Sequence, residues 1–257
     1  QKCYLPANEL IGELIEQTEG RFKVAYSISG VALEQFEAYC PEVIESFQRL
    51  ARSGCVEFLC ETYYHSLASL KDESEFLFQV DKHKKKIEAL FGQSPKVFRN
   101  TELIYSDQIG AMVAKMGFKA QIAEGAKHVL GWRSPNYLYK NYPNEDMFLL
   151  LKNFQLSDDI AFRFSQHSWE GFPLTCDKFV SWLNGVESPD CINLFMDYET
   201  FGEHQWKETG IFEFLKRLPF EVFEQSDFDF ATPSELISRY ETKDLVSSPL
   251  PMSWADE

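Results

Sequence analysis

The sequence predicts an α/β fold built around a parallel sheet. Strand-like and helix-like segments alternate about six times with short connections and no internal repeat, a pattern typical of parallel strands joined by crossover helices. Either a barrel or an open doubly wound sheet fits this pattern. The length of 257 residues suits one domain of about the size of a (β/α)8 barrel. No GxGxxG or P-loop motif opens a helix, which disfavours the nucleotide-binding form of the open sheet.

Residues 1–125 alternate regularly between the two kinds of segment. Apolar residues spaced three and four apart mark the helices, and Gly92 and Gly117 end two of them. Pro41 lies inside the second helical pattern, where it should break or kink the helix. We expect helices at 7–19, 33–50, 73–91 and 106–116, and strands at 22–29, 56–62, 96–102 and 120–125.

Residues 126–257 are less regular. Thr232 and Glu235 form a capping box with Pro233 at the first helical position, so a helix should begin there. Pro219 should stop the preceding helix, and the two prolines of the tail indicate an exit loop. We expect strands at 147–153, 160–164 and 192–199, and helices at 179–183, 210–218 and 233–240.

Composition indicates which partners are excluded and which cellular compartment is favoured. The chain has 25 basic and 40 acidic residues, and this net charge of −15 argues against nucleic acid and other phosphate-rich partners. No apolar run approaches the roughly 18 residues needed to span a bilayer, so we expect no membrane partner. The six cysteines form no CxxC pair and no zinc spacing. Free thiols favour a reducing compartment, and we expect a cytoplasmic protein.

The stretch at 192–205, INLFMDYETFGEHQ, is the strongest candidate for chemistry. Its apolar run has no alternation, which predicts a strand buried on both faces. Asp197 and Glu199 follow directly, and burying such charges costs several kcal/mol unless they are paired. If the strand continues to Glu199, both carboxylates point the same way, because side chains in a strand repeat every second residue.

Polar side chains gather where several predicted strands end. Glu61 and His65 follow one strand, Glu102 ends another, and Asp197 with Glu199 ends a third. In a barrel, reactive residues cluster at the carboxyl ends of the strands. Two carboxylates facing each other across a cleft can cleave a glycosidic bond, one as the nucleophile and the other as the acid. Glu102 and Asp197, on different strands, are the candidate pair.

Both carboxylates lie in distinctive segments, NTELIYSD (100–107) and MDYETFGEHQ (196–205). Further segments of this kind are GCVEFLCETYYHSL (54–67), GWRSPNYLY (131–139), LSDDIAFRF (156–164) and ATPSEL (231–236). Together they resemble glycoside hydrolase family 57, in its α-amylase-like branch, and they follow the family's order over nearly the whole chain. The resemblance implies an incomplete, TIM-like (β/α)7 barrel. It also implies a retaining glycosidase or transglycosylase of the α-amylase or 4-α-glucanotransferase type, acting on α-1,4-glucans.

The resemblance also implies roles for single residues. Glu102 in NTELIY becomes the nucleophile, and Asp197 in MDYETFG becomes the acid/base. The chemistry needs no cofactor and no metal, and an α-glucan or maltooligosaccharide is the expected substrate. The resemblance makes His65 and His204 substrate-contacting or supporting residues. From the residues themselves we expect further contacts at Glu61, Trp132, Glu199 and Trp206.

The sequence departs from the family's pattern in two places. The family opens with a strand that ends in His-Gln-Pro, and no such motif occurs here; the last residues are PMSWADE (251–257), where the family continues into a helical segment. We therefore expect a fragment, with a partial barrel at 1–245 that lacks its first strand and the start of the helical segment at 246–257. The exposed barrel edge should leave this chain inactive by itself.

Other interpretations of the same residues remain open. Glu102 at a helix start could complement the helix dipole, and Asp197 with Glu199 could pair with a structural arginine. A relative that binds glucan without turnover would keep the same fold. A metal-dependent polysaccharide deacetylase is the enzymatic alternative, with His65, His167, His204 and Asp197 as its ligands, although no HxxxH spacing supports it.

Overall fold

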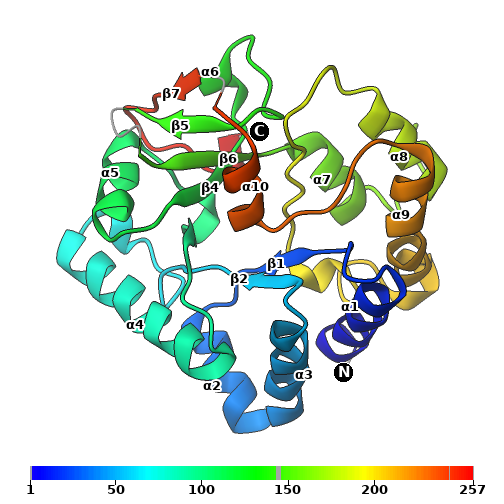
Figure 1. The fold of residues 1–257 in the computed structure, drawn as a ribbon, viewed down its shortest axis with the longest axis horizontal. Helices are drawn as coiled ribbons and strands as arrows, with labels where there is room; N and C mark the ends of the chain where they lie inside the picture. Colours follow the sequence, from blue (N-terminus) through cyan, green and yellow to red (C-terminus); the bar gives the residue numbers. More distant parts are fainter. Residues whose placement is uncertain (1, 143–145, 243, 257) are drawn as a thin grey trace.

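The computed structural model describes residues 2–142, 146–242 and 244–256. It is an α/β fold in which short strands lie together inside a ring of helices (Figure 1). One sheet pairs β1 (Val24–Tyr26) with β2 (Val56–Phe58) in parallel. The second sheet has the order β3-β4-β6-β5-β7, formed by β3 (Val97–Arg99), β4 (Ala120–Glu124), β6 (Phe148–Lys152), β5 (Tyr139–Asn141) and β7 (Asp244–Val246).

Backbone hydrogen bonds extend the parallel pairing beyond the two sheets. The Cys60 N–H donates to the Val97 carbonyl at 3.0 Å and the Arg99 N–H to the Cys60 carbonyl at 2.8 Å, which joins β2 to β3. At the far side, the Asn153 N–H donates to the Asn193 carbonyl at 2.9 Å beside the end of β6. A parallel row therefore runs β1-β2-β3-β4-β6, and Asn193 lies next to its last strand.

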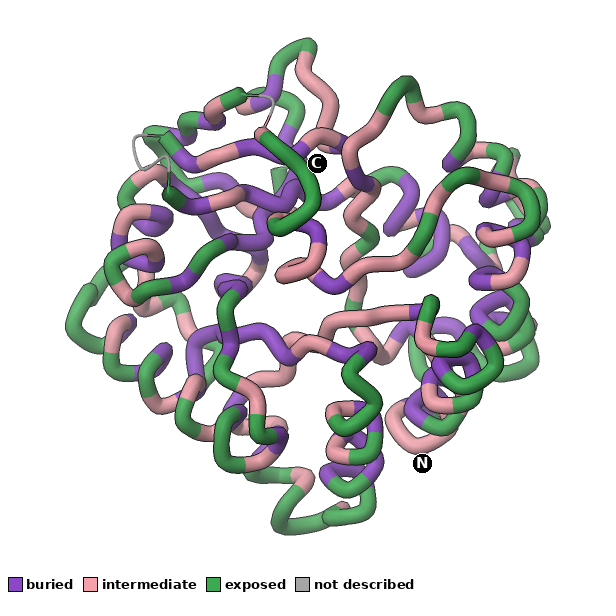
Figure 2. Tube along the Cα trace, viewed as in Figure 1, coloured by how far each residue is buried: buried purple, intermediate pink, exposed green. Residues whose placement is uncertain are grey.

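The helices cover the outside of this row and bury their inward faces. In Figure 2 the helices in the lower part are buried on the side facing the strands and exposed on the outer side. Within the described ranges, no helix is both long and apolar enough to cross a bilayer. The helices are α1 (Tyr4–Gln17), α2 (Gly30–Tyr39), α3 (Pro41–Arg52), α4 (Glu73–Phe91), α5 (Asp107–Lys115), α6 (Lys127–Leu130), α7 (Phe154–Ala161), α8 (Cys176–Asn184), α9 (Ile211–Gln225) and α10 (Pro233–Arg239).

Helix α10 closes the end of the row at which the strands begin. Leu236 packs with Val97 and Ala120, the first residues of β3 and β4. The Ser234 N–H donates to Glu57 of β2 at 2.8 Å. Since α10 covers the amino ends of these strands, their carboxyl ends are the ends left available for a site.

Most predicted elements of residues 1–125 are confirmed. The four strands occur within the predicted ranges, shortened to three to five residues each. Pro41 divides the second helical pattern into α2 and α3, with Cys40 between them, as expected from its missing N–H. The Thr232–Glu235 capping box is present in both directions at the start of α10.

Two predictions about helices and strands are wrong. The range 160–164 is no strand, because α7 runs through Ile160 with its N-terminus capped by Asn153, whose side chain accepts from the Leu156 N–H at 3.0 Å. Nor does Pro219 stop α9, which continues to Gln225. Burial of Val222 in the next turn, against α7 and α8, outweighs the hydrogen bond that proline removes.

The prediction of a buried strand at 192–199 is also wrong. The segment is extended, but it forms only the single bridge between Asn193 and Lys152. Leu194 is 37% exposed, and Asp197 is exposed as well. β5 pairs with Phe148 and Leu149 of β6. The segment 192–199 therefore pairs only with Lys152 at the end of β6, and most of its backbone has no strand partner on β6.

The sheet is mixed, whereas a parallel one was predicted. β5 runs antiparallel to β6 and parallel to β7, both outside the predicted strands. The tail is no free exit loop either, because the backbone of Met252 pairs in both directions with Tyr105, at 2.8 and 2.9 Å. The tail therefore returns to the segment that directly follows Glu102.

Candidate active site

Charged side chains meet at the carboxyl ends of β2, β3, β4 and β6. Because these strands are parallel neighbours, residues that follow them lie at one edge of the sheet. Glu61 comes after β2, Glu102 after β3, Glu124 ends β4 and Lys152 ends β6. The structure thus brings together residues that are up to 91 positions apart in the sequence (152 minus 61).

Glu102 lies in a backbone conformation that side chains rarely adopt. Its φ is +55°, and that of Leu103 is +54°, both in the left-handed region. Each such residue costs about 1–2 kcal/mol, which the surrounding structure must offset. The Asn100 side chain donates to the Ile104 carbonyl at 2.9 Å across this turn, and Leu103 is fully buried. The turn leaves the Glu102 side chain 44% exposed.

His65 lies between two carboxylates. Its Nδ1 is 3.1 Å from Glu61 Oε2, and its Nε2 is 3.2 Å from Glu102 Oε1. The hydrogen bond with Glu61 raises the pKa of His65, against the effects of burial and of the nearby Arg99 charge. When both ring nitrogens carry a proton, His65 donates to both carboxylates and stabilises the charge on each.

Glu61 is the buried carboxylate of this group, and only 1% of its surface is exposed. Burial alone would raise its pKa, but the His65 hydrogen bond, the Arg99 charge and a 2.7 Å hydrogen bond from Ser27 together lower the pKa of Glu61. The Glu61 backbone N–H donates to His83 Nδ1 at 3.3 Å. Burial lowers the pKa of His83, so it is the neutral imidazole that accepts this bond.

Arg99 and Trp254 belong to the same group, and the sequence reasoning missed both. Arg99 Nη1 lies 3.7 Å from Glu61 Oε2, and its Nε has no hydrogen-bond partner among the described residues. Trp254 Nε1 donates to Glu102 Oε2 at 2.7 Å. Arg99 stood inside a predicted strand and Trp254 in a predicted loop, so no local pattern distinguished them.

A second group of side chains lies around the segment that bears Asp197 and Glu199. They flank Tyr198 at a 3-10 turn, η3 (Tyr198–Thr200). The Tyr198 hydroxyl donates to Asn8 Oδ1 at 2.7 Å and accepts from Tyr26 at 3.2 Å, while Glu199 accepts from the Tyr4 hydroxyl. Burial raises the pKa of Tyr4, and the Glu199 hydrogen bond and the charges of Glu199 and Asp197 raise it further. Glu199 is therefore bonded to Tyr4, whereas Asp197 is exposed.

The two groups are neighbours across β1, without a direct bond between Glu102 and Asp197 in the described ranges. Tyr26 of β1 bonds to Tyr198, whereas the next residue, Ser27, bonds to Glu61. The Arg99 guanidinium also lies 5.3 Å from the centre of the Phe195 ring, two residues before Asp197. These contacts connect the segment that bears Asp197 with the group that contains Glu102.

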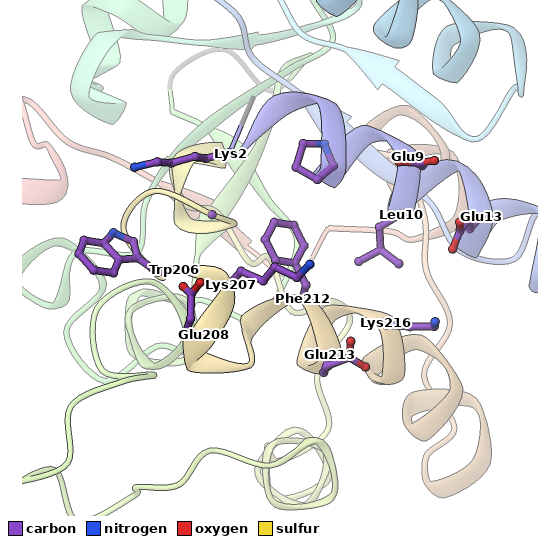
Figure 3. Close-up of a pocket in the computed structure, with 12 residues that line it drawn as sticks. Lys2, Glu9, Leu10, Glu13, Trp206, Lys207, Glu208, Phe212, Glu213 and Lys216 are labelled. Carbon is purple, nitrogen blue, oxygen red and sulfur yellow. The ribbon is translucent and has the colours of Figure 1, made fainter.

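The other predicted contact residues are spread more widely. Trp132 is 94% exposed in the loop after α6, and His204 is exposed beyond the second group. Trp206 lines a hollow of about 640 Å³ between α1 and α9, together with Lys2 and Phe212 (Figure 3). Neither Glu102 nor Asp197 lines that hollow.

Among the residues that the structure describes, no group of three or more His, Cys, Asp and Glu side chains is arranged to hold a metal ion. The predicted deacetylase ligands accordingly do not come together as a set there. His65 instead bonds to the two glutamates, and the ring of His167 stacks on Phe172 at a centroid distance of 4.3 Å.

Comparison with known proteins shows the family to which the chain belongs. The family model described as Glycosyl hydrolase family 57 matches residues 1–249. The chain belongs to this family. A protein of Methanocaldococcus jannaschii, whose name marks it as a candidate alpha-amylase, is 48% identical over 258 residues. An alpha-amylase of Pyrococcus abyssi is 24% identical over 260 residues.

The family 57 chain spans only part of these relatives. It covers 54% of the Methanocaldococcus protein and 37% of the Pyrococcus protein, with 99% and 97% of its own residues aligned. Among solved structures, the 4-alpha-glucanotransferase of Thermococcus litoralis superimposes with a TM-score of 0.79 at 19% identity, covering 99% of this chain and 38% of that one. That likeness shows that the two share a fold.

Proposed function

We propose that this family 57 chain is the catalytic region of a retaining enzyme that hydrolyses or transfers α-1,4-glucans. The environment of Glu102 carries the proposal. Its carboxylate stands at the end of β3, in a strained turn, partly exposed and bonded to two donors. Strained backbone concentrates at functional sites, because the surrounding structure must hold it in place. A solvated helix-start glutamate would need neither the strain nor the donors.

The reaction follows from two carboxylates with different tasks. Glu102 attacks the anomeric carbon of the sugar, while Asp197 in its acid form gives a proton to the departing glycosidic oxygen. A covalent glycosyl ester on Glu102 results. Asp197, now a carboxylate, takes a proton from water or from a sugar hydroxyl, whose oxygen displaces Glu102 and restores both groups. Two inversions give net retention, and the acceptor decides between hydrolysis and transfer.

The remaining predicted residues receive supporting or contacting roles in this proposal. Glu61 holds His65, and His65 holds Glu102 through Oε1. Glu199 orients the turn beside Asp197 through Tyr4. We assign stacking on sugar rings to the two exposed indoles, at Trp132 and Trp206, and a peripheral contact to His204.

The architecture that we propose is an incomplete (β/α)7 barrel without its first strand. Support comes from the parallel row β1-β2-β3-β4-β6 with Asn193 beside β6, and from α10 across the amino ends. We retain the division into a partial barrel at 1–245 and the start of a further segment at 246–257. The six free cysteines favour a reducing compartment, and so a cytoplasmic protein.

Substitution of the two carboxylates in the complete protein tests the proposal. We expect Glu102→Gln and Asp197→Asn each to lower kcat on maltooligosaccharides by at least about 1000-fold, because each removes a group that the transition state needs. Glu102→Gly with added azide should release a β-glycosyl azide, formed by direct attack on the empty side of the anomeric carbon.

The matched control is Glu88→Gln, which changes an exposed glutamate on α4. It should keep wild-type activity. Unchanged turnover by a folded Glu102→Gln protein would remove Glu102 as the nucleophile. Glucan binding by the wild type without any turnover would indicate the non-catalytic relative. Activity that survives a chelator, with no bound metal detected, would exclude the deacetylase.

A further inference from the structure

Trp254 links the tail of the chain to the candidate nucleophile. It begins a short 3-10 turn, η5 (Trp254–Asp256), and its indole N–H donates to Glu102 Oε2 at 2.7 Å. The indole nitrogen only donates and does not titrate. The ability of Trp254 to donate this bond therefore does not depend on the protonation state of other groups in the site.

The tail that carries Trp254 is fixed on both sides of it. Before it, Met252 pairs with Tyr105 through two backbone hydrogen bonds, only three residues after Glu102. After it, the Asp256 carboxylate accepts from the Ser253 N–H at 2.6 Å and closes the turn. Because the tail is tied to the same segment that bears Glu102, donor and acceptor move together.

The ring of Trp254 also rests on a buried cation. Lys152 Nζ lies 5.5 Å from the ring centre, and Lys152 is 5% exposed at the end of β6. That ammonium group is 3.2 Å from the buried Glu124 carboxylate. A cation is attracted to the face of an indole ring, so Lys152 favours the observed orientation of the Trp254 side chain. The orientation of the indole is thus set by β6 as well as by the tail.

The two donors act on different oxygens of the Glu102 carboxylate. His65 Nε2 lies 3.2 Å from Oε1, and Trp254 Nε1 lies 2.7 Å from Oε2. One donor would leave the group free to swing about its last side-chain bond, whereas two donors on opposite oxygens fix its plane. Attack on a sugar carbon depends on such placement, since a displacement of about 1 Å lowers a rate roughly 100-fold.

We propose that Trp254 is a positioning residue, which holds the plane of the Glu102 carboxylate for attack on the anomeric carbon. This inference rests on the proposed role of Glu102 as the nucleophile. The inference means that the segment after residue 245 orients Glu102 for the reaction, in addition to packing against the fold.

Two substitutions in the complete protein test the inference. Trp254→Phe keeps an aromatic ring beside Lys152 but removes the N–H donor. We expect kcat on a 4-nitrophenyl α-maltooligoside to fall about 10- to 100-fold, with KM changed less than about threefold, because the sugar contacts remain. Trp254→His restores a ring N–H on a smaller, more polar ring. Its kcat should lie between those of the wild type and Trp254→Phe.

The ranking of the variants separates positioning from packing. A packing role predicts that His, the poorer filler, is worse than Phe, and that result would overturn the inference. Wild-type kcat in Trp254→Phe would overturn it as well. Trp182→Phe, a matched change on α8 where the indole packs against Trp169 and Phe179, should keep wild-type kcat.

Glu102→Gln distinguishes failure of the inference from failure of the proposed function. If that variant keeps its activity, the nucleophile assignment falls and the inference falls with it. If that variant is inactive while Trp254→Phe is unaffected, the proposed function stands and only the role of Trp254 is wrong.

Discussion

His65 and Glu61 determine how the candidate site responds to protons. Glu61 is buried, yet its pKa is lowered below its usual value, because the His65 hydrogen bond and the Arg99 charge overcome the effect of burial. His65 has a raised pKa for the reciprocal reason. An imidazolium paired with a buried carboxylate keeps its orientation toward Glu102.

This pair makes folding stability depend on pH. His65 binds its proton more tightly in the folded protein, so its stabilising effect is complete below the unfolded pKa of about 6.5 and is lost as pH rises through the raised value. Glu61 has the opposite sign: its effect is present above about pH 4.3 and is lost as pH falls through the lowered value. We expect His65→Gln to flatten the decline in melting temperature above about pH 6.5.

The control for this prediction is His128→Gln, an exposed histidine on α6. Its melting temperature should follow the wild-type pH profile throughout. A second check is the His65 titration by NMR, which should move to lower pH in Glu61→Gln, because the largest cause of the raised pKa is then gone. A wild-type profile in His65→Gln would contradict the assigned pair.

At the scale of elements, α10 carries a stabilising role separate from the site. Its capping box satisfies two backbone donors, and Leu236 packs onto the beginnings of β3 and β4. We expect Thr232→Ala to lower the free energy of unfolding by about 1 kcal/mol, measured by urea unfolding, with kcat and KM unchanged. Thr232→Ser keeps the capping oxygen and should stay close to the wild type. A fall in kcat at full folding would show that α10 contributes to the site.

Elements specified by neighbouring residues could be predicted from the sequence. The capping box at Thr232 and the break at Pro41 involve contacts within about four residues, and both are confirmed. The segment 192–199 was misjudged, because its apolar residues pack against distant parts rather than in a ladder. β5 and β7 are three residues each, and their pairing partners lie far along the chain, so no local pattern revealed them.

For the candidate site, sequence reasoning supplied residues but not their contacts. Glu61, His65 and Glu102 were expected at strand ends, and the structure joins them through His65. Arg99 and Trp254 were missed, because their partners lie 38 and 152 positions away (99 minus 61 for Arg99). Contacts of that range depend on the topology of the whole molecule, which periodicity does not encode.

At the scale of the whole molecule, the proposed function requires Glu102 and Asp197 to face each other across the bound sugar. Tyr26 of β1 bonds to Tyr198, which follows Asp197, and the next residue, Ser27, bonds to Glu61 of the group that contains Glu102. For a retaining enzyme we expect carboxyl groups about 5–5.5 Å apart in a crystal structure with a bound maltooligosaccharide. A separation of about 6.5–9.5 Å would leave room for a water and indicate inversion.

The bond between Trp254 and Glu102 has a consequence for synthesis on the ribosome. After Glu102 is added, 152 further residues must be translated before its indole partner exists, which takes roughly 8–30 s at about 5–20 residues per second. During that interval the nascent chain can form α1 to α9 and most of the strands. Glu102 therefore receives its indole donor only after residue 254 has been added to the chain.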